Sequence, residues 1–380
     1  GSNFLIAAGL FHMIEDYGWS AELQDTFAPH AALGLIPARV TAHHRGSWRL
    51  MTPRGERTGR LSGRFMLEAA QGEHPVVGDW LAVSEVEGSG GGPAGAPGGA
   101  PGGAMIHALL PRRGAFKRRA AGDGGVQVVA ANIDTALLVA ALNGDLNLRR
   151  LERYLVAARD GGARPVIVLT KADLSADPQG AVREVEAIAG GAAVAALSAL
   201  TGEGLEGLSA WLKPGATAVL LGSSGAGKST LLNALAGDTL MDTGAVRASD
   251  DRGRHTTTHR ELFRLPGGAL LVDTPGMREL GLLAVEEALD ASFEDVIALF
   301  PQCRFSDCTH EREPGCAVLA GLADGTLGEE RWRGYQKLQR ELAFEATKDD
   351  PAAEAARRSK WKQIHRDQRS KLRQRNRDRE

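Results

Sequence analysis

Cysteine is scarce in this chain: only three occur among 380 residues, and all lie between Cys303 and Cys316. The opening residues 1–3 lack the charged and apolar layout of a secretory signal, so we expect a cytoplasmic protein. An odd number of cysteines in such a protein argues against a disulfide framework and favours a metal site. The chain also lacks any run of about 18 apolar residues, which argues against a transmembrane helix.

A formal net charge of −2 conceals an uneven distribution. Residues 357–380 contain eleven Lys or Arg and three acids, a net charge of +8, so residues 1–356 carry −10. A basic tail on an acidic body suggests a nucleic-acid partner for the tail, with a solvated charged helix as the alternative. Apolar residues make up 43% of the chain, and its length suits two or three domains.

Residues 1–37 are interpreted as an N-terminal extension, which contains a short helical pattern at residues 20–27. Short β-like runs, punctuated by Gly and Pro, follow this extension. Five such runs predict an OB-type barrel over residues 38–118, although periodicity does not exclude an SH3-like barrel. Residues 88–103, almost all Gly, Ala and Pro, are expected to form a flexible loop, with an interdomain linker as the alternative. The predicted strands are residues 36–41, 47–52, 59–67, 79–86 and 105–110.

Apolar strands alternate with helical stretches through residues 119–284, which predicts an α/β domain with a parallel sheet covered on both faces. The predicted strands are residues 136–142, 165–169, 193–197, 218–221 and 269–272, and the helices are residues 148–159, 181–189 and 229–236. Residues 285–350 are predicted to form a helical zinc-binding subdomain. Residues 351–380 are predicted to form a basic C-terminal helix.

A phosphate-loop motif, G-x-x-x-x-G-K-[ST], is matched between a predicted strand and a predicted helix at residues 222–229. Its glycines permit close backbone approach, so that successive N–H groups can face phosphate oxygens. Lys228 is expected to bridge the terminal phosphates, and Ser229 to coordinate Mg²⁺. The residues expected to hold the phosphates are Gly222, Ser223, Ser224, Gly225, Ala226, Gly227, Lys228, Ser229 and Thr230.

A base-recognition motif, Thr170-Lys171-Ala172-Asp173, precedes the phosphate loop in the chain. Asp173 can accept two hydrogen bonds from the ring N–H and amine of guanine, which adenine cannot supply. The stem of Lys171 can cover the base plane. Backbone N–H groups of Ser198, Ala199 and Leu200, after the next strand, can complete the pocket. The predicted ligand is GTP or GDP, with an ATP-dependent enzyme as the alternative.

Two further segments have the character of nucleotide switches. Asp273 ends an apolar strand and can hold the Mg²⁺ shell through water, while the N–H of Gly276 can meet the γ-phosphate. Between Lys228 and Asp273 lies a polar stretch in which one threonine can ligate Mg²⁺. Thr257 is favoured there, although Thr256 and Thr258 fit as well.

The order of these motifs, base motif before phosphate loop before switches, resembles the circularly permuted, small-ribosomal-subunit-dependent GTPases (the RsgA or YjeQ family). The resemblance covers residues 38–342. It implies a GTPase that binds the small subunit and its rRNA and acts late in subunit maturation. We expect no membrane or DNA partner, and a monomer by default.

The residue after the D-x-x-G segment is Met277, which cannot orient an attacking water as the glutamine of other GTPases does. The resemblance implies that His255 takes this role. We therefore expect slow intrinsic hydrolysis that small subunits stimulate. The alternative is an RNA-binding adaptor whose guanine-nucleotide site is nearly idle.

A metal-ligand pattern, C-x₄-C-x-H-x₅-C, is formed by Cys303, Cys308, His310 and Cys316. Three thiolates and one imidazole are a full tetrahedral set, so one structural Zn²⁺ is expected. The family that the chain resembles has the same pattern. Three free thiols beside an unrelated histidine are the alternative.

RNA contacts are expected from the basic segment 111–119, predicted to close the barrel, and from the tail at residues 357–379, which would engage phosphates without reading sequence. Trp48, Phe65 and Trp80 could stack on bases, but burial in the barrel is the favoured role.

Overall fold

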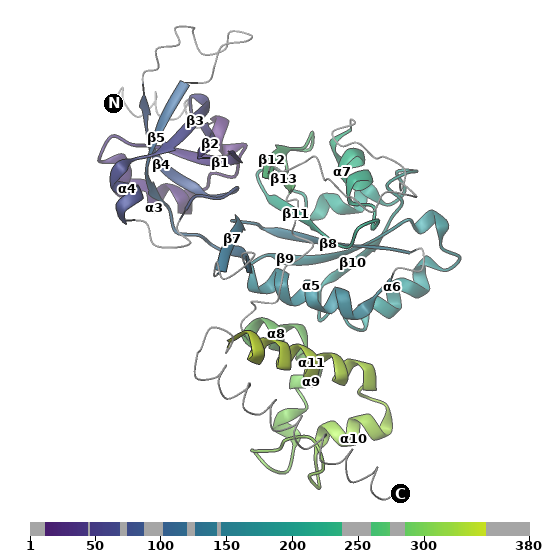
Figure 1. Ribbon diagram of the computed structural model, residues 1–380. Coiled ribbons are helices and arrows are strands. Elements are labelled where there is room, and N and C mark those ends of the chain that lie inside the picture. Colours follow the sequence, from purple (N-terminus) through teal and green to yellow (C-terminus); the bar gives the residue numbers. More distant parts are fainter. Residues whose placement is uncertain are drawn as a thin grey trace, which may run out of the picture.

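A computed structural model describes residues 12–44, 46–68, 74–86, 102–119, 126–142, 146–237, 260–273 and 286–346. A barrel, an α/β domain and a group of C-terminal helices follow one another along the chain (Figure 1). Within these ranges, no helix is long and apolar enough to span a membrane. The fold class predicted from the sequence is confirmed.

The barrel is closed by five strands around a small apolar core. Strand β1 pairs antiparallel with both β2 and β4, β4 pairs with β5, and a parallel pairing of β3 with β5 completes the ring. Trp48, Phe65 and Trp80 are all buried, as expected, so none of them offers a free face for base stacking. The strands are β1 (Ile36–His44), β2 (Ser47–Thr52), β3 (Gly55–Leu61), β4 (Trp80–Val86) and β5 (Gly102–Leu109).

Two predictions for the barrel region were wrong. The strand predicted at residues 59–67 ends at Leu61, because the Ser62 hydroxyl accepts a hydrogen bond from the Phe65 amide at 3.1 Å and begins helix α4 (Gly63–Glu68). The basic segment does not close the barrel. Its strand β6 (Ala115–Arg119) pairs with β7 (Val126–Ala131) in a separate two-stranded sheet.

Two N-terminal helices cover one side of the barrel. Helix α3 (Ala21–Ala31) begins as the sequence predicts, with Ser20 as its N-cap, and runs four residues further than residue 27. Phe27 of α3 and Ile14 of the short helix α2 (His12–Glu15) pack with Trp80 in one apolar cluster.

The α/β domain contains the predicted parallel sheet, in the order β10-β9-β8-β11-β13. Strand β8 is buried at every position, as expected of a strand covered on both faces. The strands are β8 (Thr135–Ala141), β9 (Arg164–Thr170), β10 (Ala193–Ala196), β11 (Thr217–Leu221) and β13 (Leu270–Asp273). The helices are α5 (Leu148–Asp160), α6 (Pro178–Glu186) and α7 (Lys228–Ala236), with 3₁₀ turns η1 (Ala172–Leu174) and η2 (Leu205–Ala210).

A strand that the sequence analysis missed, β12 (Arg260–Arg264), pairs antiparallel with β13. Its other edge pairs with β1 of the barrel. The barrel strands and the strands of the α/β domain therefore form one continuous eleven-stranded sheet.

The C-terminal helices pack around an apolar core that includes Phe293, Trp332 and Tyr335, together with Val156 from α5 of the α/β domain. The elements are α8 (Glu286–Ser292), α9 (Glu294–Ile297), η4 (Phe300–Gln302), α10 (Ala317–Asp324) and α11 (Glu329–Ala346).

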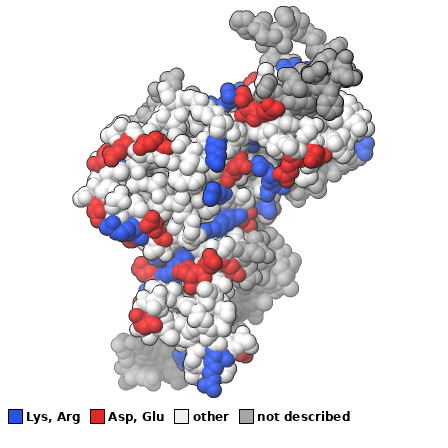
Figure 2. Space-filling model, turned by 180° about the vertical axis from the view of Figure 1, so that it is seen from behind, with Lys and Arg blue, Asp and Glu red and all other residues white. Residues whose placement is uncertain are grey.

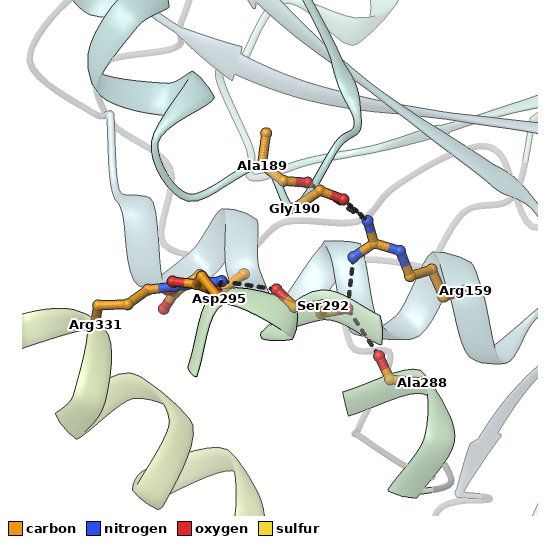
Figure 3. Close-up of polar contacts among 8 residues, drawn as sticks. Arg159, Ala189, Gly190, Ala288, Ser292, Asp295 and Arg331 are labelled. Atoms are coloured by element: carbon orange, nitrogen blue, oxygen red, sulfur yellow. Dashed lines mark hydrogen bonds and ion pairs between the residues drawn. The ribbon is translucent and has the colours of Figure 1, made fainter. Parts of the chain in front are cut away.

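A buried polar network fixes these helices to α5 (Figure 3). Arg331 of α11 donates to Glu152 Oε1 of α5 and to Asp295 Oδ1 of α9, each at 2.7 Å. It also donates to the carbonyl of Ser292 at 2.8 Å, while Arg159 of α5 donates to the Ser292 hydroxyl at 2.7 Å. Because charge-assisted hydrogen bonds are the stronger kind, the network holds the C-terminal helices in one orientation on the α/β domain.

Candidate nucleotide and metal sites

The phosphate-loop segment connects β11 directly to α7, as the motif requires. Gly222 lies so close to β8 that a Cβ added there would be 2.3 Å from the carbonyl oxygen of Val139. Gly225 and Gly227 have φ angles of +79° and +88°, in the left-handed region that favours glycine. The two positive φ angles and the close packing explain why these three positions carry no side chain.

Lys228 begins α7 and folds over the loop. Its ammonium group donates to the carbonyls of Gly222 at 2.7 Å and Ser223 at 2.5 Å. The adjacent Ser229 is exposed, and Thr230 is partly exposed in the first turn of the same helix. The N-terminal turn of α7 therefore presents a cation and two hydroxyls at the edge of the sheet where the loop lies, beside the helix end that attracts anions.

The base motif meets the phosphate loop in space, although it precedes the loop by about 50 residues. The buried Thr170, at the end of β9, donates through Oγ1 to the carbonyl of Ala226 at 2.7 Å. The neighbouring Lys171 has a φ of +60°, and its ammonium group donates to the carbonyl of Gly225 at 2.9 Å. Sequence analysis missed both contacts, which only the folded arrangement of the loop shows.

Asp173 follows in the η1 turn, and its carboxylate is exposed, without a protein hydrogen-bond partner in the described ranges. The amide of Ala172 donates to the carbonyl of Leu197, which joins this turn to the segment after β10. An exposed acceptor beside a phosphate loop has the chemistry that guanine recognition needs.

The Ser198–Leu200 segment contributes less to a base pocket than its sequence suggests. The Ser198 amide donates to the carbonyl of Glu203 at 2.9 Å, and the Ser198 hydroxyl accepts from the Thr201 amide at 3.2 Å. Ser198 therefore shapes the turn itself. The amides of Ala199 and Leu200 have no protein acceptor in the described ranges and are the ones available to a ligand.

The backbone of Asp273 ends β13, which lies parallel to β11 in the register Val272↔Val219. Its chain position is thus at the carboxyl edge of the sheet, next to the strand that leads into the phosphate loop. His255, Thr257 and Gly276 lie outside the described residues, as does Met277.

The four predicted zinc ligands converge. The ligand atoms of Cys303, Cys308, His310 and Cys316 all lie within 4.8 Å of one another. The Sγ atoms of Cys303 and Cys316 are 4.0 Å apart, and they lie 3.6 Å and 3.4 Å from His310 Nδ1. Tetrahedral Zn²⁺ with bonds of about 2.3 Å to sulfur and about 2.0 Å to nitrogen requires separations of about 3.8 Å and about 3.5 Å. The donors fit that ion in number, chemistry and spacing.

Backbone donors favour the thiolate form of Cys303. Burial alone would raise the pKa of Cys303, but hydrogen bonds from the amides of Ala317 and Val318, together with those involving Cys308 and Cys316, lower the pKa overall. Cys316 caps α10, and its Sγ accepts from the amide of Leu319 at 3.5 Å. Sulfur in this form is the ligand that zinc binds.

A residue that sequence analysis missed organises the turn around His310. Glu313 accepts hydrogen bonds from the hydroxyl of Thr309 and from the amides of Thr309, Glu311 and Arg312. The Thr309 hydroxyl and then the Arg312 amide lower the pKa of Glu313 to about 2, which keeps its carboxylate ionised. The sequence feature that could have indicated this role is the position of Glu313 between the ligands His310 and Cys316.

The basic segment offers fewer unpaired cations than its composition suggests. Arg112 pairs with Asp79 at 2.7 Å, and Arg113 with Asp134 at 3.1 Å, whereas Lys117 is exposed. On the face shown in Figure 2, Lys and Arg side chains are interspersed with Asp and Glu side chains. Charge therefore does not single out one RNA-binding surface on that face.

Comparisons with known proteins agree with this geometry. A family model described as RsgA GTPase matches residues 109–283. A small ribosomal subunit biogenesis GTPase RsgA from Opitutus terrae is 50% identical over 366 residues, covering 95% of this chain and 98% of that protein. The crystal structure of YjeQ from Thermotoga maritima matches with a TM-score of 0.59 at 28% identity, covering 81% of this chain and 99% of that one. YloQ, described as a circularly permuted GTPase, has the same fold, with a TM-score of 0.56 at 24% identity and coverage of 81% and 95%.

Proposed function

The chain belongs to the RsgA GTPase family and is a GTP hydrolase by that membership; we propose that it binds the small ribosomal subunit and hydrolyses GTP during late maturation of that subunit. The observation that carries the proposal is the pair of hydrogen bonds from Thr170 and Lys171 to the phosphate loop. They support one site that holds the base and the phosphates of a single guanosine nucleotide. A nearly idle adaptor finds no support, because the curated relative is named a GTPase.

In this proposal each end of the nucleotide has its own protein groups. Asp173 accepts from the guanine edge, the stem of Lys171 covers the base, and the amides of Ala199 and Leu200 complete the pocket. At the other end, Lys228 exchanges its bonds to the loop carbonyls for bonds to the terminal phosphates. The remaining phosphate-loop residues, 222–227, present their N–H groups to phosphate oxygens.

We assign Mg²⁺ coordination to the Ser229 hydroxyl, with Asp273 holding the ion's water shell. Thr257 would join them when GTP is bound, and the N–H of Gly276 would meet the γ-phosphate. The ion would neutralise charge that develops on the phosphate oxygens during transfer.

The group that orients the attacking water is the unusual part of the site. Met277 cannot do so, whereas His255 carries an imidazole, whose ring nitrogens can hydrogen-bond to water. We therefore propose that His255 positions the water, and that contact with the small subunit makes it effective. Basal turnover should then be low.

The partners follow from the same proposal. We infer one structural Zn²⁺ at the cysteine–histidine cluster, and contacts of the barrel and of residues 357–379 with rRNA. We propose RNA as the nucleic-acid partner, no contact with DNA or a membrane, and a monomer. We propose the cytoplasm as the site of action.

The test is phosphate release from GTP at rising concentrations of isolated small subunits. Large subunits serve as the control for added RNA, and Lys228→Ala as the control for contaminating activity. We expect a saturable rise on the order of 100-fold, since a positioned water-activating group contributes that much or more. Equal turnover with and without small subunits would contradict the proposal.

A further inference from the structure

Strand β12 connects the barrel to the edge of the nucleotide sheet. In its pairing with β1, Glu261 lies opposite Ala42, and Arg260 lies opposite His43. In its pairing with β13, Glu261 lies opposite Asp273. One residue of β12 is therefore the register partner both of a barrel residue and of the predicted Mg²⁺-shell residue.

Ion pairs hold both ends of β12 to the N-terminal part of the chain. Arg49 of barrel strand β2 contacts Glu261, with Nη1 and Oε1 separated by 2.5 Å and both side chains about two-thirds covered. At the other end, Arg264 contacts Asp16, in the turn after α2, at 3.0 Å. A strand fixed by a neighbour at each edge and by an ion pair at each end has little freedom to move independently of the barrel.

A second connection runs from β1 to the strand that carries the phosphate loop. The side chain of Arg39 is buried, and its Nη2 donates to Thr217 Oγ1 at 2.7 Å, where β11 begins. Burial lowers the pKa of Arg39 to about 10, so the guanidinium remains charged at neutral pH. The barrel strand β1 thus contacts two strands of the sheet that lead to the nucleotide edge.

We propose that Arg49 and Glu261 are positioning residues for GTP hydrolysis, through which the barrel sets the position of β12 and hence of Asp273. This inference rests on the proposed function. RNA bound to the barrel would then alter turnover through the sheet itself. Because coupling between two binding sites is reciprocal, the bound nucleotide would equally alter the affinity of the barrel for RNA.

The test compares Arg49→Glu, Glu261→Arg and the double charge swap in the full-length protein. Each single change places like charges together, and the swap restores an ion pair with opposite polarity. We expect the ratio of subunit-stimulated to basal turnover to fall about fivefold or more in each single variant, the lower range of allosteric coupling, and to recover in the swap. Recovery in the swap separates positioning from simple loss of fold.

Glu85→Arg is the matched control. Glu85 lies on strand β4, which does not pair with β12, and forms ion pairs with Arg54 and Arg57 of the same barrel. The same charge reversal at that position should leave the turnover ratio at the wild-type value. A ratio unchanged in both single variants, or a swap no better than either of them, overturns the inference.

A second measurement keeps the inference separate from the proposed function. If wild-type turnover does not respond to small subunits, the proposed function fails. The positioning role is then judged by the affinity for a non-hydrolysable GTP analogue with Mg²⁺ relative to that for GDP. Glu261→Arg should lower this ratio about fivefold, and the swap should restore it. An unchanged ratio contradicts the positioning role.

Discussion

Replacement of Arg331 by methionine should release the C-terminal helices from the α/β domain. Arg331 is 8% exposed and binds Glu152, Asp295 and the carbonyl of Ser292, and its guanidinium lies 4.0 Å from the ring centroid of Phe293. Methionine fills most of the volume but supplies none of the donors. Glu152, which is 3% exposed, would keep a buried carboxylate that has lost its closest cation.

The expected loss of stability of the C-terminal helices follows from that unpaired charge. Removing one partner of a buried ion pair costs about 3–5 kcal/mol. The lost hydrogen bond to Ser292 belongs to the same network, so its cost is not added separately. Burial already raises the pKa of Glu152 even though Arg331 is present, which indicates how little water reaches this carboxylate. For a unit of about 60 residues, the change corresponds to a fall of at least about 12 °C in its melting temperature.

The measurement is native-state hydrogen exchange of the amides of α11. Exchange reports opening of these helices separately, which is needed because a chain with several domains does not unfold in one step. Arg333→Met is the matched control, because Arg333 is exposed and forms an ion pair with Glu329 one turn away, a contact that contributes about 0.3–0.5 kcal/mol.

The double variant Arg331→Met with Glu152→Met tests the cause. Replacing both charges by apolar groups of similar volume is often neutral, so the double variant should recover about half of the loss or more. If the free energy of opening of these helices in Arg331→Met lies within about 1 kcal/mol of the wild-type value, the argument that this arginine holds the interface is refuted. A double variant that is less stable than Arg331→Met would refute the same argument.

Three further predictions concern the nucleotide, the metal and the tail. Asp173→Asn should weaken GTP binding relative to ATP roughly 10-fold or more, since hydrogen bonds to a charged group contribute about 1.5–3 kcal/mol; competition binding that still favours GTP to the wild-type extent contradicts the assigned role. Purified protein should contain one zinc per chain, and a chelator should melt α10 and its neighbours first; metal analysis without zinc would remove that site. Changing six Lys or Arg of residues 357–379 to Glu should weaken subunit binding and reduce the slope of log affinity against log salt, and an unchanged affinity would show that the tail makes no phosphate contacts.

The parts predicted well from the sequence are those in which local pattern and chemistry coincide. The phosphate loop needs glycines at fixed positions before a helix, so the pattern of residues 222–229 is enough to place this segment between a strand and a helix. The spacing from Cys303 to Cys316 brings four donors together with little dependence on the rest of the fold. The long apolar strands β8 and β9 are equally clear, because burial on both faces leaves little room for polar residues.

The parts that were missed depend on distant partners. Strand β12 reads Arg-Glu-Leu-Phe-Arg, and such a charged segment becomes a strand because β13 and β1 flank it. Arg331 and Glu152 stand 179 residues apart, and either alone would be expected on the surface. Pattern-based prediction cannot pair charges across such separations. The Ser62 cap that ends β3 was a local signal, but strand-like residues on both sides concealed it.

The permuted motif order is compatible with an intact nucleotide site because the site depends on which strands are neighbours in the sheet. The order of those strands along the chain does not matter. Strand β8 lies between β9 and β11, so the base motif and the phosphate loop reach the same edge in either order. What the order does change is the attachment of the other modules. The barrel now touches β12, and α8 begins 13 residues after Asp273. The barrel and the C-terminal helices that precede the basic tail are therefore both joined to the phosphate end of the site, where hydrolysis changes the ligand. A subunit bound to the barrel or to the tail could best sense or control turnover at that end.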